Sequence, residues 1–257
     1  MGGAGGAARA AGNGGDNGLN GISSIRFSTF LAALSGEIRK VRSGEKTKLN
    51  LLSSGVRLLE DVGYRDLNVE DVSLDAGLAK GTFYIHFPSK DAFLHEMARR
   101  YVDYERQIYP VLPSNHSHYA NVRQWIAWYE TTFMNNVGVL RAMVQMADVD
   151  ATMCAIWHDR NEAIADRTLE FAVRRMGQPP RDRDLFHLMQ RTAGGMLDQS
   201  LFARLRIQAG PGIKQEYPAE FLIELHALML YRALYGQNPP ADQAGEICAL
   251  VEMQVPE

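Results

Sequence analysis

The residues whose types and spacing best suit chemistry lie between residues 79 and 90, and the chemistry they suit is contact with phosphate groups. The segment begins with small side chains, which let backbone N–H groups approach a phosphate or a base edge closely. Longer side chains follow, with donors that reach phosphate oxygens. The candidate contact residues are Ala79, Lys80, Gly81, Thr82, Tyr84, His86 and Lys90.

Two short helices joined by a glycine turn are predicted to position these residues. Asn68 is the expected N-cap of a helix that runs through Ala76 and ends at Gly77. A second helix is expected over about 79–86, which gives the spacing of a helix-turn-helix. The predicted core of this unit consists of Val69, Val72, Ala76, Leu78, Phe83 and Phe87, packed against Leu52, Val56 and Leu59.

Helical periodicity dominates the rest of the chain, and no stretch shows sustained alternation of apolar and polar residues, so we expect an all-α protein. One apolar stripe predicts a helix that ends at Gly63, and Ser89 is the expected N-cap of a long helix. Further helices are expected near 117–136, 138–149, 151–176, 182–208, 217–236 and 240–253, with Gly138 as one of the breaks.

Composition excludes several classes of protein. The chain has 257 residues, of which 46% are hydrophobic and 22% charged, unlike a collagen, a disordered chain or a disulfide-stapled mini-protein. Nine of its 23 glycines fall within the first 21 residues, which predicts a loose head. The two cysteines fit a reducing compartment, and neither a secretory signal nor a membrane-spanning apolar run is visible. We expect a cytoplasmic protein without membrane contact.

Charge is distributed unevenly along the chain. Residues 1–48 carry a net charge of +4 and the remainder −7, a layout common among nucleic-acid binders. The basic amphipathic stretch 26–42, predicted to end at the Ser43-Gly44 pair, has three interpretations: it docks on the body, contacts DNA, or stays disordered until something binds. Residues 46–106 hold nine basic and ten acidic groups, so the segment is not a uniformly basic surface.

The segment 47–95 resembles the DNA-binding domain of the TetR family of transcriptional repressors. The matching elements are Glu60–Tyr64, Asn68–Val72 and Ala76–Lys90, and the last of these is highly specific. The resemblance implies a homodimer whose two recognition helices enter successive major grooves of a palindromic operator. Leu74 departs from the family pattern, which usually has a smaller or polar residue. The residues implied to lie near bases or adjacent phosphates are Asn68, Ala79, Lys80, Gly81 and Thr82, and the implied phosphate anchors are Tyr84, His86 and Lys90.

The resemblance also divides the chain into three expected parts. A flexible, Gly-rich and basic extension covers 1–45, a helix-turn-helix DNA-binding domain covers 46–93, and a larger helical domain for effector binding and dimerisation covers 94–257. The long helices near 182–208 and 217–236 carry apolar residues. Together with their copies in a second subunit they would form a four-helix interface, and the alternative is purely internal packing.

The middle of the chain is rich in large, soft apolar side chains, which suit either an ordinary helical core or an adaptable cavity. The family resemblance implies an effector pocket there, for a small apolar or amphiphilic molecule. The predicted lining residues are Trp125, Trp128, Phe133, Met143, Met146, Trp157, Met196 and Phe202, with Asn161, Asp198 and Gln199 as polar residues that could orient the ligand.

No catalytic or metal-binding pattern is recognisable. His116 and His118 have no carboxylate ligand nearby, and the phosphate-binding glycine loop and the nucleophile elbow are both lacking. We therefore expect no enzyme activity and no cofactor. The resemblance implies a homodimeric repressor that an effector releases from its operator, and the alternative is a constitutive DNA-binding scaffold that recruits a protein partner.

Overall fold

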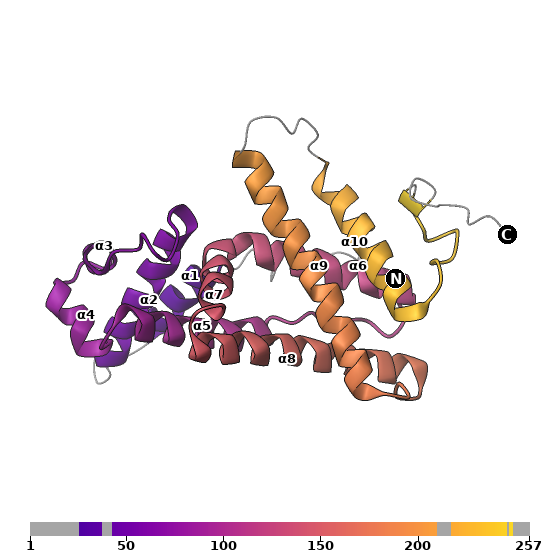
Figure 1. Cartoon of the computed structure of the whole chain (residues 1–257), viewed down its shortest axis with the longest axis horizontal. Helices are drawn as coiled ribbons and strands as arrows, with labels where there is room; N and C mark the ends of the chain where they lie inside the picture. The colour runs from indigo at the N-terminus through magenta and orange to yellow at the C-terminus, as the bar shows by residue number, and fades with distance from the viewer. Residues whose placement is uncertain (1–25, 38–42, 210–216, 246, 249–257) are drawn as a thin grey trace, which may run out of the picture.

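The computed structural model describes residues 26–37, 43–209, 217–245 and 247–248, and in this part of the chain the fold is all-α. The molecule is elongated, with α3 and α4 at one end and α9 and α10 toward the other (Figure 1). Its helices are α1 (Phe27–Glu37), α2 (Ser43–Asp61), α3 (Val69–Asp75), α4 (Lys80–His86), α5 (Lys90–Gln107), α6 (His118–Asn135), α7 (Val137–Ala147), α8 (Ala151–Met176), α9 (Arg183–Ala209) and α10 (Ala219–Tyr235).

Local capping explains why α3 and α4 form where the sequence predicts them. The Asn68 side chain accepts a hydrogen bond from the Glu70 N–H at 3.0 Å and so satisfies one of the unpaired donors that begin α3. Gly77 follows the helix with φ +68°, a conformation that glycine adopts without strain. Val72 and Phe83 are buried beneath the turn, which confirms the predicted core.

Helix α1 packs against the body, which is the first of the three interpretations for the stretch 26–42. Phe27 and Leu31 are buried, and the Phe27 ring lies 5.4 Å from that of Tyr101. The backbone N–H of Phe27 donates to Asn136 Oδ1 at 2.8 Å. Residues 27–37 are therefore an ordered part of the body, whereas residues 1–25 and 38–42 lie outside the described residues.

The Ser43-Gly44 pair does not separate two helices by itself, because α2 begins at Ser43. Serine and glycine are tolerated in a first helical turn, where backbone N–H groups have no partner within the helix. Whether the three-part division at residues 45 and 93 describes separate domains stays a prediction. Residue 45 lies in the first turn of α2, and residue 93 lies within α5.

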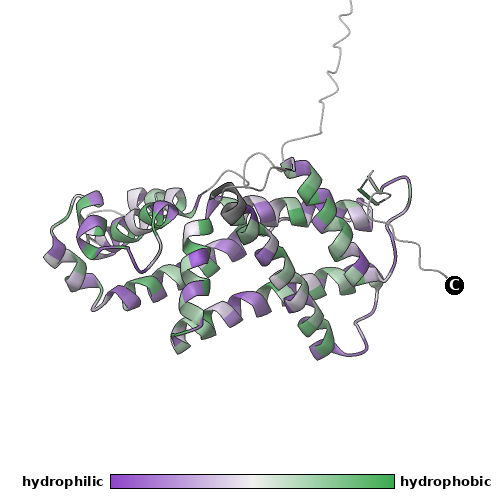
Figure 2. Ribbon diagram, turned by 45° about the horizontal axis from the view of Figure 1, so that its top comes forward, coloured by the Kyte–Doolittle hydropathy of each residue, from purple (hydrophilic) through white to green (hydrophobic). Residues whose placement is uncertain are grey.

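The long helices alternate hydrophobic and hydrophilic segments along their length, as expected for helices that bury one face (Figure 2). Helix α5 continues directly from α4 across Pro88 and Ser89, and the Ser89 side chain caps it by accepting from the Ala92 N–H at 3.0 Å. Residues on one face of α5, from Phe93 to Glu105, are buried between α2 and α8. Helix α5 therefore connects the helix-turn-helix to the body.

Gly138 lies inside α7, so its prediction as a helix break is wrong. A Cβ at this position would overlap the Leu59 carbonyl oxygen and would lie 2.8 Å from the Glu60 nitrogen. The glycine is needed for the close approach of α7 to the backbone of α2, and the helix boundary lies instead at Asn136.

The C-terminal helices agree with prediction up to residue 236. Gly177 and Gly236 end α8 and α10 in left-handed conformations, with φ of +75° and +67°. A single helix from residue 240 is wrong for the described part, because residues 241–244 form turns and bends and the helical backbone resumes at 247. Residues 249–253 lie outside the described residues.

Substitution Gly138→Ala tests the close approach of α2 and α7. We expect the free energy of unfolding to fall by about 1–3 kcal/mol, because the new methyl group meets backbone atoms that cannot rotate away. Urea unfolding monitored by tryptophan fluorescence measures it. Gly36→Ala is the matched control, since open space surrounds its Cβ position. Equal stability of both variants would contradict the close approach.

Candidate nucleic-acid interface and cavity

The surface of α4 has the character expected of a recognition helix. Ala79, Lys80 and Gly81 are exposed at its start, and open space surrounds the Cβ position of Gly81. Tyr84 is 50% exposed, so its ring is not mostly core. Thr82 and His86 are half-buried on the same helix. Backbone groups and donors at the start of α4 are therefore accessible to a large partner, at the end of the molecule where Figure 1 places this helix.

Lys80 is paired within the helix-turn-helix. Its Nζ donates to Glu70 Oε1 at 2.7 Å, and both side chains are more than half exposed. The hydrogen bond to Glu70 raises the pKa of Lys80 above its usual value. Exposed pairs of this kind are weak, so a phosphate can compete with Glu70 for the ammonium group. The Asn68 acceptor, in contrast, is used to cap α3, and only its amide donors remain for DNA.

Lys90 is held in a way that the sequence did not suggest. Its Nζ donates to the carbonyl oxygens of Tyr64, Arg65 and Leu67, at 3.0, 3.2 and 3.1 Å, and lies 4.6 Å from the centre of the Tyr64 ring. An ammonium group has three donors, and these contacts use all of them. This geometry favours a structural role for Lys90, which fixes the turn before α3. Phosphate anchoring by Lys90 stays a prediction.

The same turn is tied to α5 through Tyr64. The buried Tyr64 hydroxyl donates to Asp91 Oδ1 at 2.5 Å, and burial, followed by this carboxylate, raises the pKa of Tyr64 far above its usual value. Asp91 and Lys90, the first two residues of α5, therefore both hold the segment before α3. Side-chain contacts therefore join the helix-turn-helix to α5, in addition to the chain itself.

Two apolar side chains of the helix-turn-helix lie on its outside. Leu74, the departure from the family pattern, is 79% exposed, and Ile85 is equally exposed. Leu74 therefore changes the surface of α3 and not its packing.

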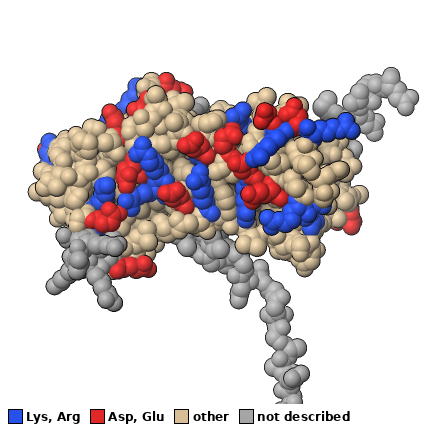
Figure 3. Space-filling view, turned by 90° about the horizontal axis from the view of Figure 1, so that it is seen from below, with Lys and Arg blue, Asp and Glu red and all other residues tan. Residues whose placement is uncertain are grey.

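Charge is not concentrated at this end, because positive and negative side chains are intermixed along the face drawn in Figure 3. Binding to DNA would rely on individual donors and not on a broad basic surface.

A cavity of about 380 Å³ opens between α6, α8 and α9. We call it the Trp157 cavity. Its volume lies in the range of pockets that hold small organic ligands. Its wall includes Trp125, Tyr129, Trp157, Asn161, Asp198 and Phe202. Three of the predicted apolar lining residues (Trp125, Trp157 and Phe202) and all three predicted polar ones (Asn161, Asp198 and Gln199) are in this wall.

The other five predicted lining residues do not line this cavity. Trp128, Phe133 and Met143 are buried in the hydrophobic core, and Met146 is half-buried against it. Met196 is 52% exposed on the opposite side of α9, where it lines a groove between α9 and α10. Residue type alone predicts large soft side chains, but the rotation of each helix decides whether they face a cavity, the core or the surface.

A buried ion pair connects the wall of the cavity to α5. Arg160 donates from Nε and Nη2 to the two carboxylate oxygens of Glu105, at 2.8 and 2.7 Å, and both side chains are at most 2% exposed. The Arg160 guanidinium also lies 4.9 Å from the Trp157 ring centre, and its Nη1 donates to Asn161 at 3.3 Å. Trp157 and Asn161 line the cavity, so a ligand there would be one residue away from α5.

The wall of the Trp157 cavity also includes one acidic residue, Asp198. The Tyr129 hydroxyl donates to Asp198, and burial raises the pKa of the Asp198 carboxyl above its usual value, against the lowering effect of Arg160.

The Arg160–Glu105 pair was not predictable from sequence, because the two residues are 55 positions apart on different helices. Glu105 carried one signal, an acidic residue at a position of α5 where the helical pattern expects an apolar one.

A second buried cluster lies between α6, α9 and α10. Ser200 Oγ is 2.8 Å from His226 Nε2, and His226 Nδ1 is 2.7 Å from Glu130 Oε1. Hydrolytic triads share this order of groups, but they also need free N–H donors for an oxyanion. Ser200 lies in the interior of α9, where backbone N–H groups bond within the helix. The arrangement therefore links three helices, and the backbone at Ser200 offers no free N–H donor.

The groove between α9 and α10 is lined mainly by apolar residues and exposes several of them. Its volume is about 820 Å³, and Met229 and Met196 in its wall are 39% and 52% exposed. Leu185 and Leu188 add exposed apolar surface to the first half of α9.

In the described part of the chain, no group of His, Cys, Asp and Glu side chains could hold a metal ion. None of the helices described there is long and apolar enough to cross a bilayer.

Comparison with known proteins agrees with this geometry. The sequence profile described as "Bacterial regulatory proteins, tetR family" matches residues 51–97. The chain is 26% identical over 206 residues to the HTH-type transcriptional regulator EthR of Mycobacterium tuberculosis, which covers 76% of this chain and 90% of that protein. A 50-residue segment is 50% identical to the uncharacterised HTH-type transcriptional regulator YwcC of Bacillus subtilis, covering 20% and 22% of the two chains.

Two solved structures share the fold. One is a TetR-family regulator from Mesorhizobium loti, with a TM-score of 0.56, 15% identity and coverage of 75% of this chain and 96% of the other. The second is the fatty acid degradation regulator FadR of Bacillus halodurans, with a TM-score of 0.55, 14% identity and coverage of 75% and 97%.

The exposed recognition helix and the larger helical body define a helix-turn-helix DNA-binding regulator. The match at residues 51–97, the similarity to EthR and the shared fold make the assignment more specific. The chain carries the DNA-binding domain of the TetR family of bacterial regulatory proteins at residues 51–97.

Substitution Lys90→Gln separates a structural role from phosphate contact. We expect the free energy of unfolding to fall by about 1–3 kcal/mol, because three carbonyl groups lose a charged donor. Circular dichroism during urea unfolding measures it. Lys46→Gln, at an exposed position of α2, is the control and should stay within about 0.5 kcal/mol. An unchanged stability together with a weaker salt dependence of DNA binding would show that Lys90 binds phosphate.

Substitution Glu105→Gln tests the buried ion pair. We expect a loss of about 3–5 kcal/mol in unfolding free energy, because Arg160 keeps a buried charge without its counter-charge. The double variant Glu105→Leu with Arg160→Met should recover most of this loss, since it removes both charges. Arg183→Gln breaks the exposed pair with Asp166 and should cost less than about 1 kcal/mol. A double variant no more stable than Glu105→Gln would contradict the argument.

Proposed function

We propose that this regulator is a homodimeric repressor that binds a palindromic operator and leaves it when an apolar or amphiphilic small molecule enters the Trp157 cavity. One observation carries the proposal. The buried Arg160–Glu105 pair joins the wall of the cavity to α5, and α5 is continuous with the helix-turn-helix. We place this activity in the cytoplasm, where a repressor meets DNA, and we assign no enzyme activity to it.

The DNA contacts are proposed to come from α4 and the caps beside it. Ala79 and Gly81 allow backbone donors close to the DNA, and Lys80 exchanges Glu70 for a phosphate. Asn68 and Thr82 lie near bases or adjacent phosphates in this arrangement, while Tyr84 and His86 contact the backbone. In a dimer, the two α4 helices would enter major grooves about 34–36 Å apart.

The second subunit is proposed to cover the groove between α9 and α10. A monomer rarely leaves so much apolar surface in contact with water, and a two-fold axis along these helices would bury it in both subunits. The exposed Met196 and Met229 would then lie within the interface. This arrangement is the four-helix interface expected from the resemblance to the family.

Release is proposed to follow from a change in the position of α5. A ligand in the Trp157 cavity contacts Trp157 and Asn161, which hold the Arg160 guanidinium from one side. Glu105 holds it from the other. A ligand that favours a shifted Arg160 therefore favours a shifted α5, in which the spacing of the two recognition helices no longer matches the operator. FadR of Bacillus halodurans, which shares the fold, is a fatty acid degradation regulator, and this is compatible with an amphiphilic effector here.

Selection from a pool of random duplexes with the full-length chain tests the DNA-binding half of the proposal. We expect an inverted repeat, bound by a dimer in native mass spectrometry. Lys80→Gln should reduce the slope of log K against log salt by about 0.9 per protomer, because one phosphate contact is lost. Arg181→Gln, in the connection after α8, should leave the slope unchanged. A selected sequence without two-fold symmetry, or a monomer on the DNA, would refute the operator model.

A further inference from the structure

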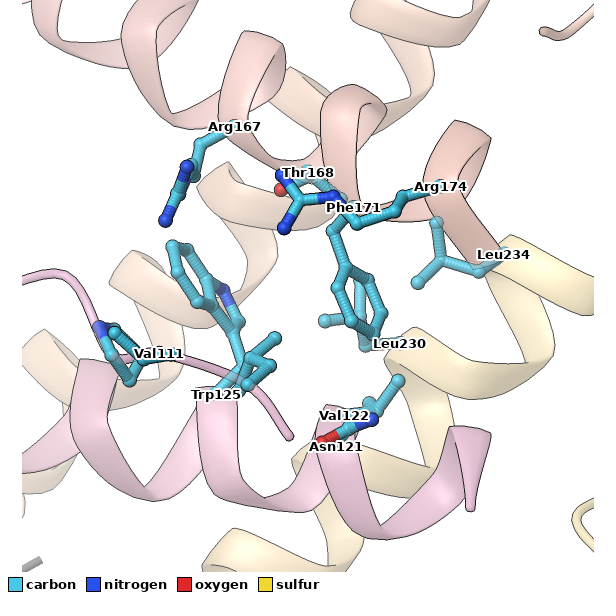
Figure 4. A pocket seen from close by; sticks show the side chains of 12 residues that line it. Val111, Asn121, Val122, Trp125, Arg167, Thr168, Phe171, Arg174, Leu230 and Leu234 are labelled. Carbon is cyan, nitrogen blue, oxygen red and sulfur yellow. The ribbon is translucent and has the colours of Figure 1, made fainter. Parts of the chain in front are cut away.

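A second, smaller pocket adjoins the Trp157 cavity, and its wall carries two arginines. We call it the Arg174 pocket, and its volume is about 70 Å³, comparable to two or three water molecules. Figure 4 shows the guanidinium groups of Arg167 and Arg174 on the same side of the pocket, close to the rings of Trp125 and Phe171. Apolar side chains from α6 and α10, among them Leu230, form much of the remaining wall.

Most N–H donors of these two arginines have no hydrogen-bond partner within the described residues. Within the described residues, Arg174 makes no hydrogen bond and no ion pair. Arg167 has a single partner, Glu170 at 3.3 Å, in an exposed i,i+3 pair. Other arginines of α8 are engaged: Arg160 binds Glu105, and Arg175 donates to the carbonyl oxygens of Ser114 and His116.

An arginine in the last turn of a helix can also stabilise that helix, because its positive charge interacts favourably with the helix dipole. That role fits Arg174 and Arg175 alike, and it does not require a side chain that lines a pocket. The lining of the Arg174 pocket includes no acidic residue. The two guanidinium groups therefore present unpaired donors to a small, largely apolar space, and carboxylates and phosphates are the groups that such donors bind best.

The two spaces are neighbours that share part of their wall. Trp125, Thr168 and Leu230 line both of them. Along α8, the residues that line the Trp157 cavity are spaced three or four apart on one face, and the same face continues through Phe171 to Arg174. One elongated molecule could therefore contact the arginines at one end and the tryptophan and phenylalanine rings at the other.

The charges along this path set the orientation of such a molecule. The wall of the Trp157 cavity contains one arginine, Arg191, and Glu162 pairs with it at 2.8 Å. The same wall contains Asp198, whose carboxyl lies beside Tyr129, and an anion placed there would meet an acidic group in a poorly solvated space. The Arg174 end carries two positive charges and no acidic lining residue. An anionic group therefore belongs at the Arg174 end, and an uncharged chain belongs in the Trp157 cavity.

We propose that the effector is a single-chain amphiphile whose anionic headgroup lies between Arg167 and Arg174 and whose chain passes Trp125 into the Trp157 cavity. This inference rests on the proposed function, because it names the class of ligand for the same cavity. Arg167 and Arg174 are then the residues that select an anionic over a neutral amphiphile. The small volume beside them suits a headgroup, and the larger cavity suits a chain.

Titration calorimetry of the full-length protein with dodecanoate, methyl dodecanoate and dodecylammonium tests this. The three probes have the same chain and differ in headgroup charge. We expect dodecanoate to bind about tenfold or more tightly than the ester, because a charge-assisted hydrogen bond to arginine is worth roughly a factor of ten. Dodecylammonium should bind more weakly than either.

Three arginine variants locate the headgroup. Arg174→Gln and Arg167→Gln should each weaken dodecanoate binding by about tenfold and leave ester binding unchanged. Arg174→Lys keeps the charge and should retain part of the preference. Arg181→Gln removes a positive charge outside both pockets and is the matched control. Unchanged thermal unfolding of Arg174→Gln, an exposed position, would show that the fold is intact.

The outcomes separate this inference from the function on which it rests. Equal binding of dodecanoate and the ester, with no effect of either glutamine variant, would overturn the anionic headgroup while leaving a neutral effector in the Trp157 cavity. If no probe binds and none releases the protein from its selected duplex, both the headgroup assignment and the effector model fail. DNA binding itself would be unaffected by either result.

Discussion

The ion pair between Glu105 and Arg160 is the contact on which the arrangement of the body depends. Two charges removed from water destabilise a fold unless each finds a partner with good geometry. Both guanidinium–carboxylate hydrogen bonds are satisfied here, so α5 and α8 have one register in which the charges are paired. Because α5 begins beside the recognition helix, this register also fixes where the helix-turn-helix lies relative to the body.

Contacts around α7 likewise hold the DNA-binding end in place relative to the body. Gly138 lets α7 lie against the backbone of α2, and the Arg141 side chain donates to the Leu59 carbonyl oxygen at 3.0 Å from the same helix. Asn136, between α6 and α7, accepts from the N–H of Phe27. The DNA-binding end is thus attached to the body through α1, α2 and α5 together.

The helix-turn-helix could be predicted in detail because its determinants are local. Asn68, Gly77 and Ser89 act on neighbouring backbone groups, and the apolar spacing between them selects which faces are buried. Gly138 shows where this reasoning fails. A glycine in a helical pattern reads as a break, and its real role depends on the carbonyl group of Leu59, which is distant in sequence.

The cavity shows the same difference between features set by local sequence and features set by distant contacts. Sequence alone determined the all-α class, the helix-turn-helix and a middle segment rich in soft apolar side chains, because these follow from local propensity and periodicity. Tertiary structure decided that Trp157 lines a cavity while Trp128 is buried in the core, and that Lys90 holds backbone carbonyls. Helix rotation and packing set these outcomes, and both depend on contacts between residues far apart in the chain.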